Sequence, residues 1–223
     1  MHITQITTAP EYAKAYLEAF ENNALTQGAW HTERDGRQLA CALGVIGPEV
    51  EGPSQCPATI MPRWLAQMVP TFFDRQKQDD AFAWGKAFTA ELARIDGKVP
   101  FSVVHDWHAN TVCVLGIEAA EKRGRDPAPH KALQALHLRA FSGEKIPAVE
   151  WRPILKDAYA DADAYAYANA YAYAYADANA YANANAYAYA NAYAYAYANA
   201  NADAWKRLAD GMVEALSRVE ALV

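Results

Sequence analysis

Two histidines in one short run are the residues of this sequence best placed for chemistry. His105 and His108 are three positions apart in the run His-Asp-Trp-His, so on a helix both imidazoles would lie on one face. Such a pair could bind zinc, and a zinc enzyme would need a third protein ligand. The candidates are His31, His130, His137 or a distant carboxylate. The alternative is that one imidazole packs or caps inside the fold while the other faces solvent. Because no HExxH motif or second ligand spacing accompanies the pair, we predict no metal and no other cofactor.

Three cysteines offer a second kind of chemistry, a thiol nucleophile. Their odd number and the lack of CxxC spacing indicate neither a disulfide framework nor a structural zinc site. Cys41 and Cys113 lie in apolar runs, where burial raises the pKa of a thiol and makes it inert. Cys56 lies in a proline-flanked loop, where we expect it to be exposed. A cysteine–histidine pair assembled from distant parts of the chain remains an alternative. The sequence contains no Gly-rich phosphate loop, GxSxG elbow or kinase signature, so we predict no catalytic residue.

Apolar periodicity predicts that residues 1–150 form an all-α domain of about six helices. Thr8 to Glu11 is a capping box with a proline inside it, which is typical of a helix N-terminus. The polar run 31–37 is expected to be a solvated loop. The other helices are expected at 38–46, 62–74 with a kink or break at Pro70, 79–95, 100–121 and 126–143, with a proline-rich loop at 47–62. Valine pairs in 100–121 leave a strand there as an alternative.

A tract of strict alternation follows this domain. Residues 157–204 consist of 24 Ala, 12 Tyr, 7 Asn and 5 Asp, and every even position is Ala. Residues 157–178 match residues 179–200 at 18 of 22 positions, and each difference places Asp in the first copy and Asn in the second. The pattern indicates an expanded DNA repeat, with fewer copies than a solenoid needs.

Two conformations compete for the tract. As a strand, the period of two places every Tyr on one face, with 177–185 as the turn between two identical strands. As a helix, the same period winds Tyr around all faces and forms no amphipathic stripe. We favour one long helix, because Ala is the strongest helix former and no Gly or Pro occurs between Pro153 and Gly211. A β-sheet over 157–204 is the alternative.

The C-terminal segment, residues 205–223, has the spacing of an amphipathic helix. Its apolar stripe must be buried against the N-terminal domain or another chain. The predicted organisation is therefore a globular domain over 1–150, a repeat tract over 151–204 and a C-terminal helix over 205–223. The stripe consists of Trp205, Leu208, Met212, Val213, Leu216 and Val219.

The tyrosines of the tract define the predicted interaction surface. Tyr buries a large, rigid area at low entropic cost, and a rod with Tyr on every side can cover them only with neighbours. The tract has five Asp and no Lys or Arg, which disfavours nucleic acid as a partner. We expect a homo-oligomer or filament, and a neutral repeat expansion left as a solvated tail is the alternative. The predicted interaction residues are Tyr165, Tyr167, Tyr171, Tyr173, Tyr175, Tyr187, Tyr189, Tyr193, Tyr195, Tyr197, Trp205, Leu208, Met212 and Leu216.

Composition restricts the class of protein further. Outside the tract, the remaining 175 residues carry 20 basic and 21 acidic side chains, which is not the charge of a protein that coats nucleic acid. No apolar run approaches the roughly 18 residues that span a membrane, so we expect no membrane partner. Residues 1–8 do not have the pattern of a secretory signal. We therefore expect a cytoplasmic protein.

Several fragments of the N-terminal region carry a resemblance to a known group of proteins. They are Trp30, Arg34-Asp35-Gly36-Arg37, Leu39-Ala40-Cys41, Cys56-Pro57-Ala58 and Met61-Pro62-Arg63-Trp64-Leu65-Ala66. These fragments resemble uncharacterised bacterial and prophage-associated proteins, in which a helical domain precedes a long Ala-rich tail that closes with a Trp and an amphipathic helix. The resemblance covers about the first 70 residues and the layout of the tail. It implies a helical fold and a phage origin, and it implies no known activity.

The predicted function is that of a non-enzymatic structural or interaction protein whose Tyr-rich tract drives self-association. The alternative is a small metal-dependent enzyme centred on His105 and His108.

Overall fold

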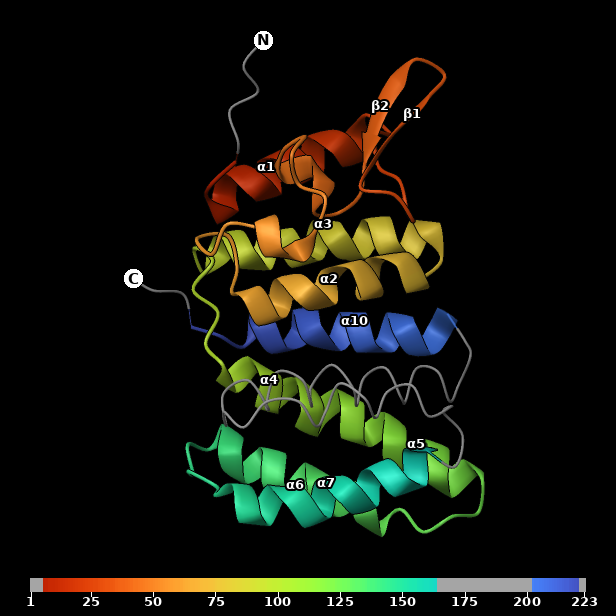
Figure 1. Cartoon of the computed structure of the whole chain (residues 1–223). Coiled ribbons are helices and arrows are strands. Elements are labelled where there is room, and N and C mark those ends of the chain that lie inside the picture. Colours follow the sequence, from red (N-terminus) through yellow and green to blue (C-terminus); the bar gives the residue numbers. More distant parts are fainter. Residues whose placement is uncertain (1–5, 164–201, 221–223) are drawn as a thin grey trace. The chain divides into compact units, whose positions relative to one another are not determined.

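The computed structural model describes residues 6–163 and 202–220, and this part of the chain is mostly helical (Figure 1). Its contacts divide into two compact units. The first unit comprises residues 1–100 and 216–223, and the second comprises residues 101–215. None of the described helices is long and apolar enough to cross a membrane.

The main helices of the first unit are α1 (Ala9–Glu21), α2 (Arg63–Arg75) and α3 (Gln78–Arg94). The start of α1 confirms the predicted capping box. The Glu11 N–H donates to Thr8 Oγ1, and the Glu11 carboxylate accepts a hydrogen bond from the Thr8 N–H at 3.1 Å. A single helix, α2, continues through Pro70 to Arg75, so the predicted break at this proline does not occur.

Two buried tyrosines fix α1 to the rest of the first unit. Tyr12 donates its hydroxyl to the Ala42 carbonyl at 2.8 Å, and Tyr16 donates to the Phe82 carbonyl at 3.1 Å. Close approach of α1 to α3 depends on a glycine. A Cβ added at Gly85 would lie 2.1 Å from the Tyr16 hydroxyl oxygen, so no larger residue fits without displacement.

A β-hairpin follows α1 where a loop and a helix were expected (Figure 1). Its strands are β1 (His31–Arg34) and β2 (Arg37–Ala40), which pair antiparallel. Asp35 and Gly36 make the turn with φ values of 53° and 71°, as a type I′ hairpin turn requires. The predicted loop at 31–37 and helix at 38–46 are therefore wrong. The strands are only four residues long, so the Asp-Gly turn was the informative signal, and apolar periodicity missed it. Of the expected helix, only the 3-10 turn η1 (Gly44–Ile46) is present.

The proline-rich segment after η1 forms the expected loop. It contains one short 3-10 turn, η2 (Pro53–Gln55), and it leads directly into α2. The loop packs closely on the end of α3, because a Cβ added at Gly97 would lie 2.4 Å from the Thr59 carbonyl oxygen. Gly97 has a φ of +69°, which also favours glycine at this position.

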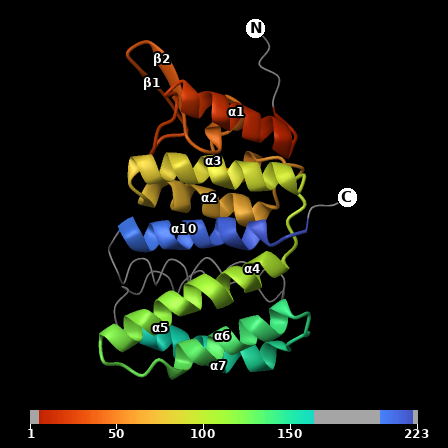
Figure 2. The same ribbon diagram turned by 180° about the vertical axis from the view of Figure 1, so that it is seen from behind.

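In the second unit, the predicted central helix over 100–121 is confirmed with one modification. It consists of α4 (Ser102–Trp107), the π-helix η3 (His108–Val112) and α5 (Cys113–Lys122), which follow one another without a gap. α6 (Ala128–Phe141) and α7 (Ala148–Asp163) complete this part, and Figure 2 shows them side by side. Cys113, Leu133, Leu155 and Ala158 form a buried core cluster, against which Trp151 and Ile154 pack.

α7 crosses the predicted boundary at residue 150 and enters the alternating tract. It begins at Ala148 and extends to Asp163, so the tract starts as a continuation of this helix. α10 (Ala202–Ser217) begins at the other end of the tract. Residues 164–201 lie outside the described residues, and so do all the tyrosines predicted for interaction. The choice between helix and sheet for that segment remains a prediction.

α10 confirms that the C-terminal segment is helical as far as Ser217, and four of the six residues of its apolar stripe are buried, whereas Val213 and Val219 are half-buried. Trp205, Leu208, Met212 and Leu216 are at most 5% exposed. The Trp107 indole Nε1–H donates to the Leu208 carbonyl at 2.9 Å, which ties α10 to α4.

Two further contacts hold α10 within the second unit. A Cβ added at Gly211 would lie 2.2 Å from Thr111 Oγ1, so α10 approaches η3 closely. Arg207 forms a bidentate ion pair with the Glu118 carboxylate, with nitrogen–oxygen distances of 2.6 and 2.9 Å. Planar, bidentate geometry is the strongest arrangement of such a pair.

Candidate functional site, a buried histidine cluster

The junction between α4 and η3 positions two of the histidines that the sequence singles out. His105 lies in α4, and His108 begins the π-helical segment. The Cys113 N–H bonds to the His108 carbonyl, five residues earlier, which is the π-helical pattern. Single π-helical turns of this kind occur frequently at functional sites.

A third histidine, from α6, meets both of them. The ring centroid of His137 lies 5.3 Å from the ring centroid of His105 and 4.4 Å from that of His108. His108 and His137 stack nearly parallel, at an interplanar angle of 15°. We call His105, His108 and His137 the histidine cluster.

Aromatic side chains surround the histidine cluster. Trp151 of α7 stacks on His105 with centroids 5.9 Å apart and meets His137 edge to face at 4.9 Å. Trp107 meets His108 edge to face at 4.9 Å. His108 and His137 are 1% and 6% exposed, so two of the three imidazoles are removed from water.

Hydrogen bonds determine which ring nitrogens of the cluster carry protons. His108 Nδ1 lies 2.9 Å from the Val104 carbonyl oxygen, which can only accept, so His108 Nδ1 is protonated. In the neutral ring His108 Nε2 is then a bare acceptor, and it is buried without a hydrogen-bond partner. The Nδ1 atoms of His105 and His137 are 3.1 Å apart, so one of them donates and the other accepts.

Burial lowers the pKa of every imidazole in the cluster. Desolvation is the largest cause in each case, and it lowers the pKa of His108 to about 3. Desolvation likewise lowers the pKa of His137 far below its ordinary value, and the neighbouring His108 and His105 lower it further. The pKa of His105 is lowered by its burial alone. The cluster is therefore a group of neutral imidazoles at neutral pH.

The orientation of the rings bears on metal binding. Stacked rings direct their lone pairs outward in parallel planes and not toward one common point. Among residues 6–163 and 202–220, no group of three or more His, Cys, Asp or Glu side chains is arranged to hold a metal ion. The alternative of a metal-dependent enzyme centred on His105 and His108 therefore gains no ligand set from these residues.

The structure places the other candidate histidines differently. His31 lies in β1 of the first unit, where its Nε2 is 2.9 Å from the Gly44 carbonyl oxygen. His130 is buried in α6. His137, another of these candidates, contacts both His105 and His108.

The cysteines are buried to different degrees, and none of their thiols is activated. Burial raises the pKa of Cys113 to about 12, as its apolar surroundings predicted. Cys56 was expected to be exposed, but it is half-buried, and desolvation raises its pKa to about 12 as well. Its flanking prolines predicted a loop correctly. The prediction of exposure was wrong, because Cys56 is half-buried within this loop.

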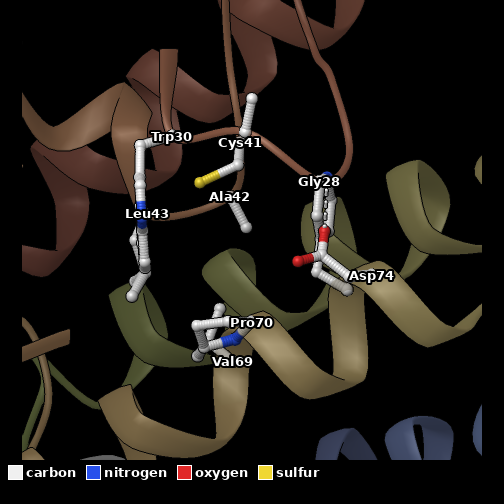
Figure 3. Close-up of a pocket in the computed structure, with 10 residues that line it drawn as sticks. Gly28, Trp30, Cys41, Ala42, Leu43, Val69, Pro70 and Asp74 are labelled. Carbon is white, nitrogen blue, oxygen red and sulfur yellow. Dashed lines mark hydrogen bonds between the residues drawn. The ribbon is translucent and has the colours of Figure 1, made fainter. Parts of the chain in front are cut away.

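Cys41 lines a hollow of about 100 Å³ in the first unit (Figure 3). Its sulfur points into the hollow above Pro70, and the Asp74 carboxylate lies at the side, where it accepts the Gly28 N–H at 3.0 Å. Burial is the main cause that raises the pKa of the Cys41 thiol, and the charge of Asp74 adds to it. The thiol is therefore protonated at neutral pH and is a poor nucleophile.

The interaction residues predicted from α10 lie inside the fold. Trp205, Leu208, Met212 and Leu216 are buried in the structure, and their role in association with a partner stays a prediction. The spacing of the apolar stripe predicted the burial of these four side chains correctly. It did not predict whether this chain or another chain would bury them.

Sequence reasoning named His137 as one of several candidate third ligands without placing it at the site, and it did not find Trp151. His137 is 32 residues from His105, and no local spacing connects the two. Trp151 was taken as the start of the repeat tract, although it packs on the histidine cluster from within α7. Contacts between helices bring these residues together, and periodicity within one helix carries no information about them.

Comparison with known proteins finds no matching family model, no matching curated protein and no matching solved structure.

Proposed function

We propose that this chain is a non-enzymatic structural protein that self-associates through its alternating tract. The observation that carries the proposal is the position of the tract. α7 leads into it and α10 leads out of it, and the second unit contains α7 and all but the last two residues of α10. The tract is therefore an insert anchored at both ends and not a free tail.

Both anchors are firmly packed. Leu155 and Ala158 of α7 belong to the buried core cluster of the second unit. α10 buries Trp205 and Leu208 and accepts the Trp107 hydrogen bond. The insert is therefore attached at both ends to packed helices.

The composition of the insert favours association with itself. Residues 164–201 contain eleven Tyr, seven Asn and one charged side chain, Asp177. Two such segments do not repel one another electrostatically. Tyr supplies apolar area and a hydroxyl, and Asn supplies hydrogen-bond donors and acceptors. Two copies of the segment can therefore bury apolar area and form hydrogen bonds with each other.

The test is the mass of the full chain in solution, measured by light scattering over a range of concentrations. In one variant all eleven Tyr of residues 164–201 are replaced by Ser, and in a matched control all seven Asn are replaced by Ser. We expect an oligomer, a multiple of the 24.5 kDa chain mass, for the wild type, an oligomer for the Asn variant, and a monomer for the Tyr variant. A monomeric wild type would support the neutral repeat expansion instead, and equal masses for all three chains would exclude Tyr as the cause.

A further inference from the structure

A second feature, in the first unit, is a groove of about 820 Å³ between the hairpin, the end of α1 and the start of α3. This volume lies in the range of pockets that take small ligands or short peptides. The apolar part of its lining consists of Phe20, Leu25, Leu39 and Phe82. The two leucines are buried and the two phenylalanines are half-buried, so the rings present apolar area to a ligand.

The register of the hairpin directs two arginines into the groove. Arg34 lies directly opposite Arg37, and directly opposed residues of paired strands point to the same face. Leu39 follows two positions after Arg37 and shares that face, and all three line the groove. Glu33 and Gln38 point to the other face, where the Gln38 amide donates to the Glu33 carboxylate at 2.9 Å.

Two like charges in direct opposition destabilise a hairpin, so the charges of the arginine pair do not stabilise it. Within the described residues, neither guanidinium forms an ion pair. With Asp35 in the turn, the hairpin tip carries two cationic side chains and one anionic side chain, so its net charge is positive. Paired guanidinium groups present planar N–H donors that suit a carboxylate.

The opposite wall of the groove is acidic. Glu21 ends α1 and Asp79 lies in the first turn of α3, and both are exposed. The same wall already accepts a cation, because the Lys86 ammonium lies 5.5 Å from the Phe20 ring centroid. The groove is therefore bipolar, with cations at the hairpin tip, acids at the helix ends and aromatic rings in its lining.

We propose that this groove binds a short peptide segment of another protein in which an acidic and a basic side chain flank an apolar one. Arg34 and Arg37 would bind the acidic side chain, Glu21 and Asp79 the basic one, and Phe82 would contact the apolar one. The alternating tract has no basic residue and cannot supply this ligand. The proposal is thus independent of self-association.

The experiment measures binding of blocked tripeptides to the full chain by NMR titration. The probes are acetylated, amidated Lys-Phe-Glu, Gln-Phe-Glu and Lys-Phe-Gln. We expect Lys-Phe-Glu to bind most tightly, and each lost charge to weaken binding about fivefold, as for exposed ion pairs. Higher salt should reduce these differences.

Two double variants test which wall of the groove binds which charged side chain of the probe. In the variant with Arg34→Gln and Arg37→Gln, Lys-Phe-Glu should bind no more tightly than Lys-Phe-Gln. It should still bind more tightly than Gln-Phe-Glu. Glu21→Gln with Asp79→Asn should do the reverse. Glu33→Gln, on the other face of the hairpin, is the matched control and should change neither preference. Equal affinity for all three probes, or preferences that survive both double variants, would overturn the proposal.

Discussion

Acid should destabilise the second unit through the histidine cluster. Burial lowers the pKa of His108 to about 3 in the folded chain, whereas its ordinary value, which the unfolded chain recovers, is 6.5. Between these two pH values the unfolded chain binds a proton that the folded chain does not. The free energy of unfolding therefore falls as the pH falls below 6.5, and it is constant above that value.

The size of this effect follows from the two pKa values. At about pH 5, His108 alone should remove roughly 2 kcal/mol from the free energy of unfolding, relative to about pH 7.5. The pKa of His137 is lowered for the same reason, so its contribution has the same sign. With a urea dependence of about 2 kcal/mol per molar, His108 alone should lower the unfolding midpoint by about 1 M.

The assay compares urea midpoints of the wild type and His108→Phe at both pH values. Phe preserves a flat ring for the stack on His137 but cannot bind a proton, so its midpoint should depend less on pH by about 1 M. His31→Gln removes a histidine from outside the cluster and should behave as the wild type.

The pKa of Glu118 is lowered from 4.5 by its bond to Arg207, so that carboxylate loses its stabilising effect only at lower pH.

An equal loss of stability in the wild type and His108→Phe would refute the reasoning. It would mean that the imbalance in proton binding between the folded and unfolded chains lies elsewhere. A wild-type midpoint that does not change over this range would refute it as well, because the neutral buried imidazole must then be accessible to protons in the folded chain.

Three further outcomes are expected from the packing. Gly211→Ala would place a Cβ 2.2 Å from Thr111 Oγ1 and should lower stability by about 1–3 kcal/mol in thermal or urea unfolding, with partial recovery on adding Thr111→Ala. Gly85→Ala should cost at least as much in the same assay, because the Cβ meets the ring of the fully buried Tyr16, and an unchanged midpoint would show that α1 can move. Burial raises the pKa of Cys113 to about 12, so a thiol reagent at pH 8 should leave it unmodified in the folded chain and modify it in urea; equally fast reaction in both states would contradict its burial.

How far the sequence predicts the fold depends on whether a signal is local. The capping box at Thr8 and the stripe that begins at Trp205 lie within one helix each, and both helices are present. The hairpin was missed, because two four-residue strands are too short for periodicity and only Asp35-Gly36 marked the turn.

The histidine cluster shows the same limit. The spacing of His105 and His108 predicted a shared face, which is a property of one helix. Contact with His137 and Trp151 depends on how α6 and α7 pack on α4, and no short-range pattern carries that information. Contacts distant in the sequence likewise define the two compact units.

The anchoring of the alternating tract at both ends has a consequence for how such a chain can change. The internal repeat is 22 residues long, an even number, so gain or loss of one copy keeps every Ala in phase with the alternation. Such a change also leaves the core residues of α7 and α10 in place, because it alters only the chain between them. Slippage during DNA replication could therefore vary the number of tyrosines, and with it the number of contacts available to the proposed self-association, while the folded units keep their sequence.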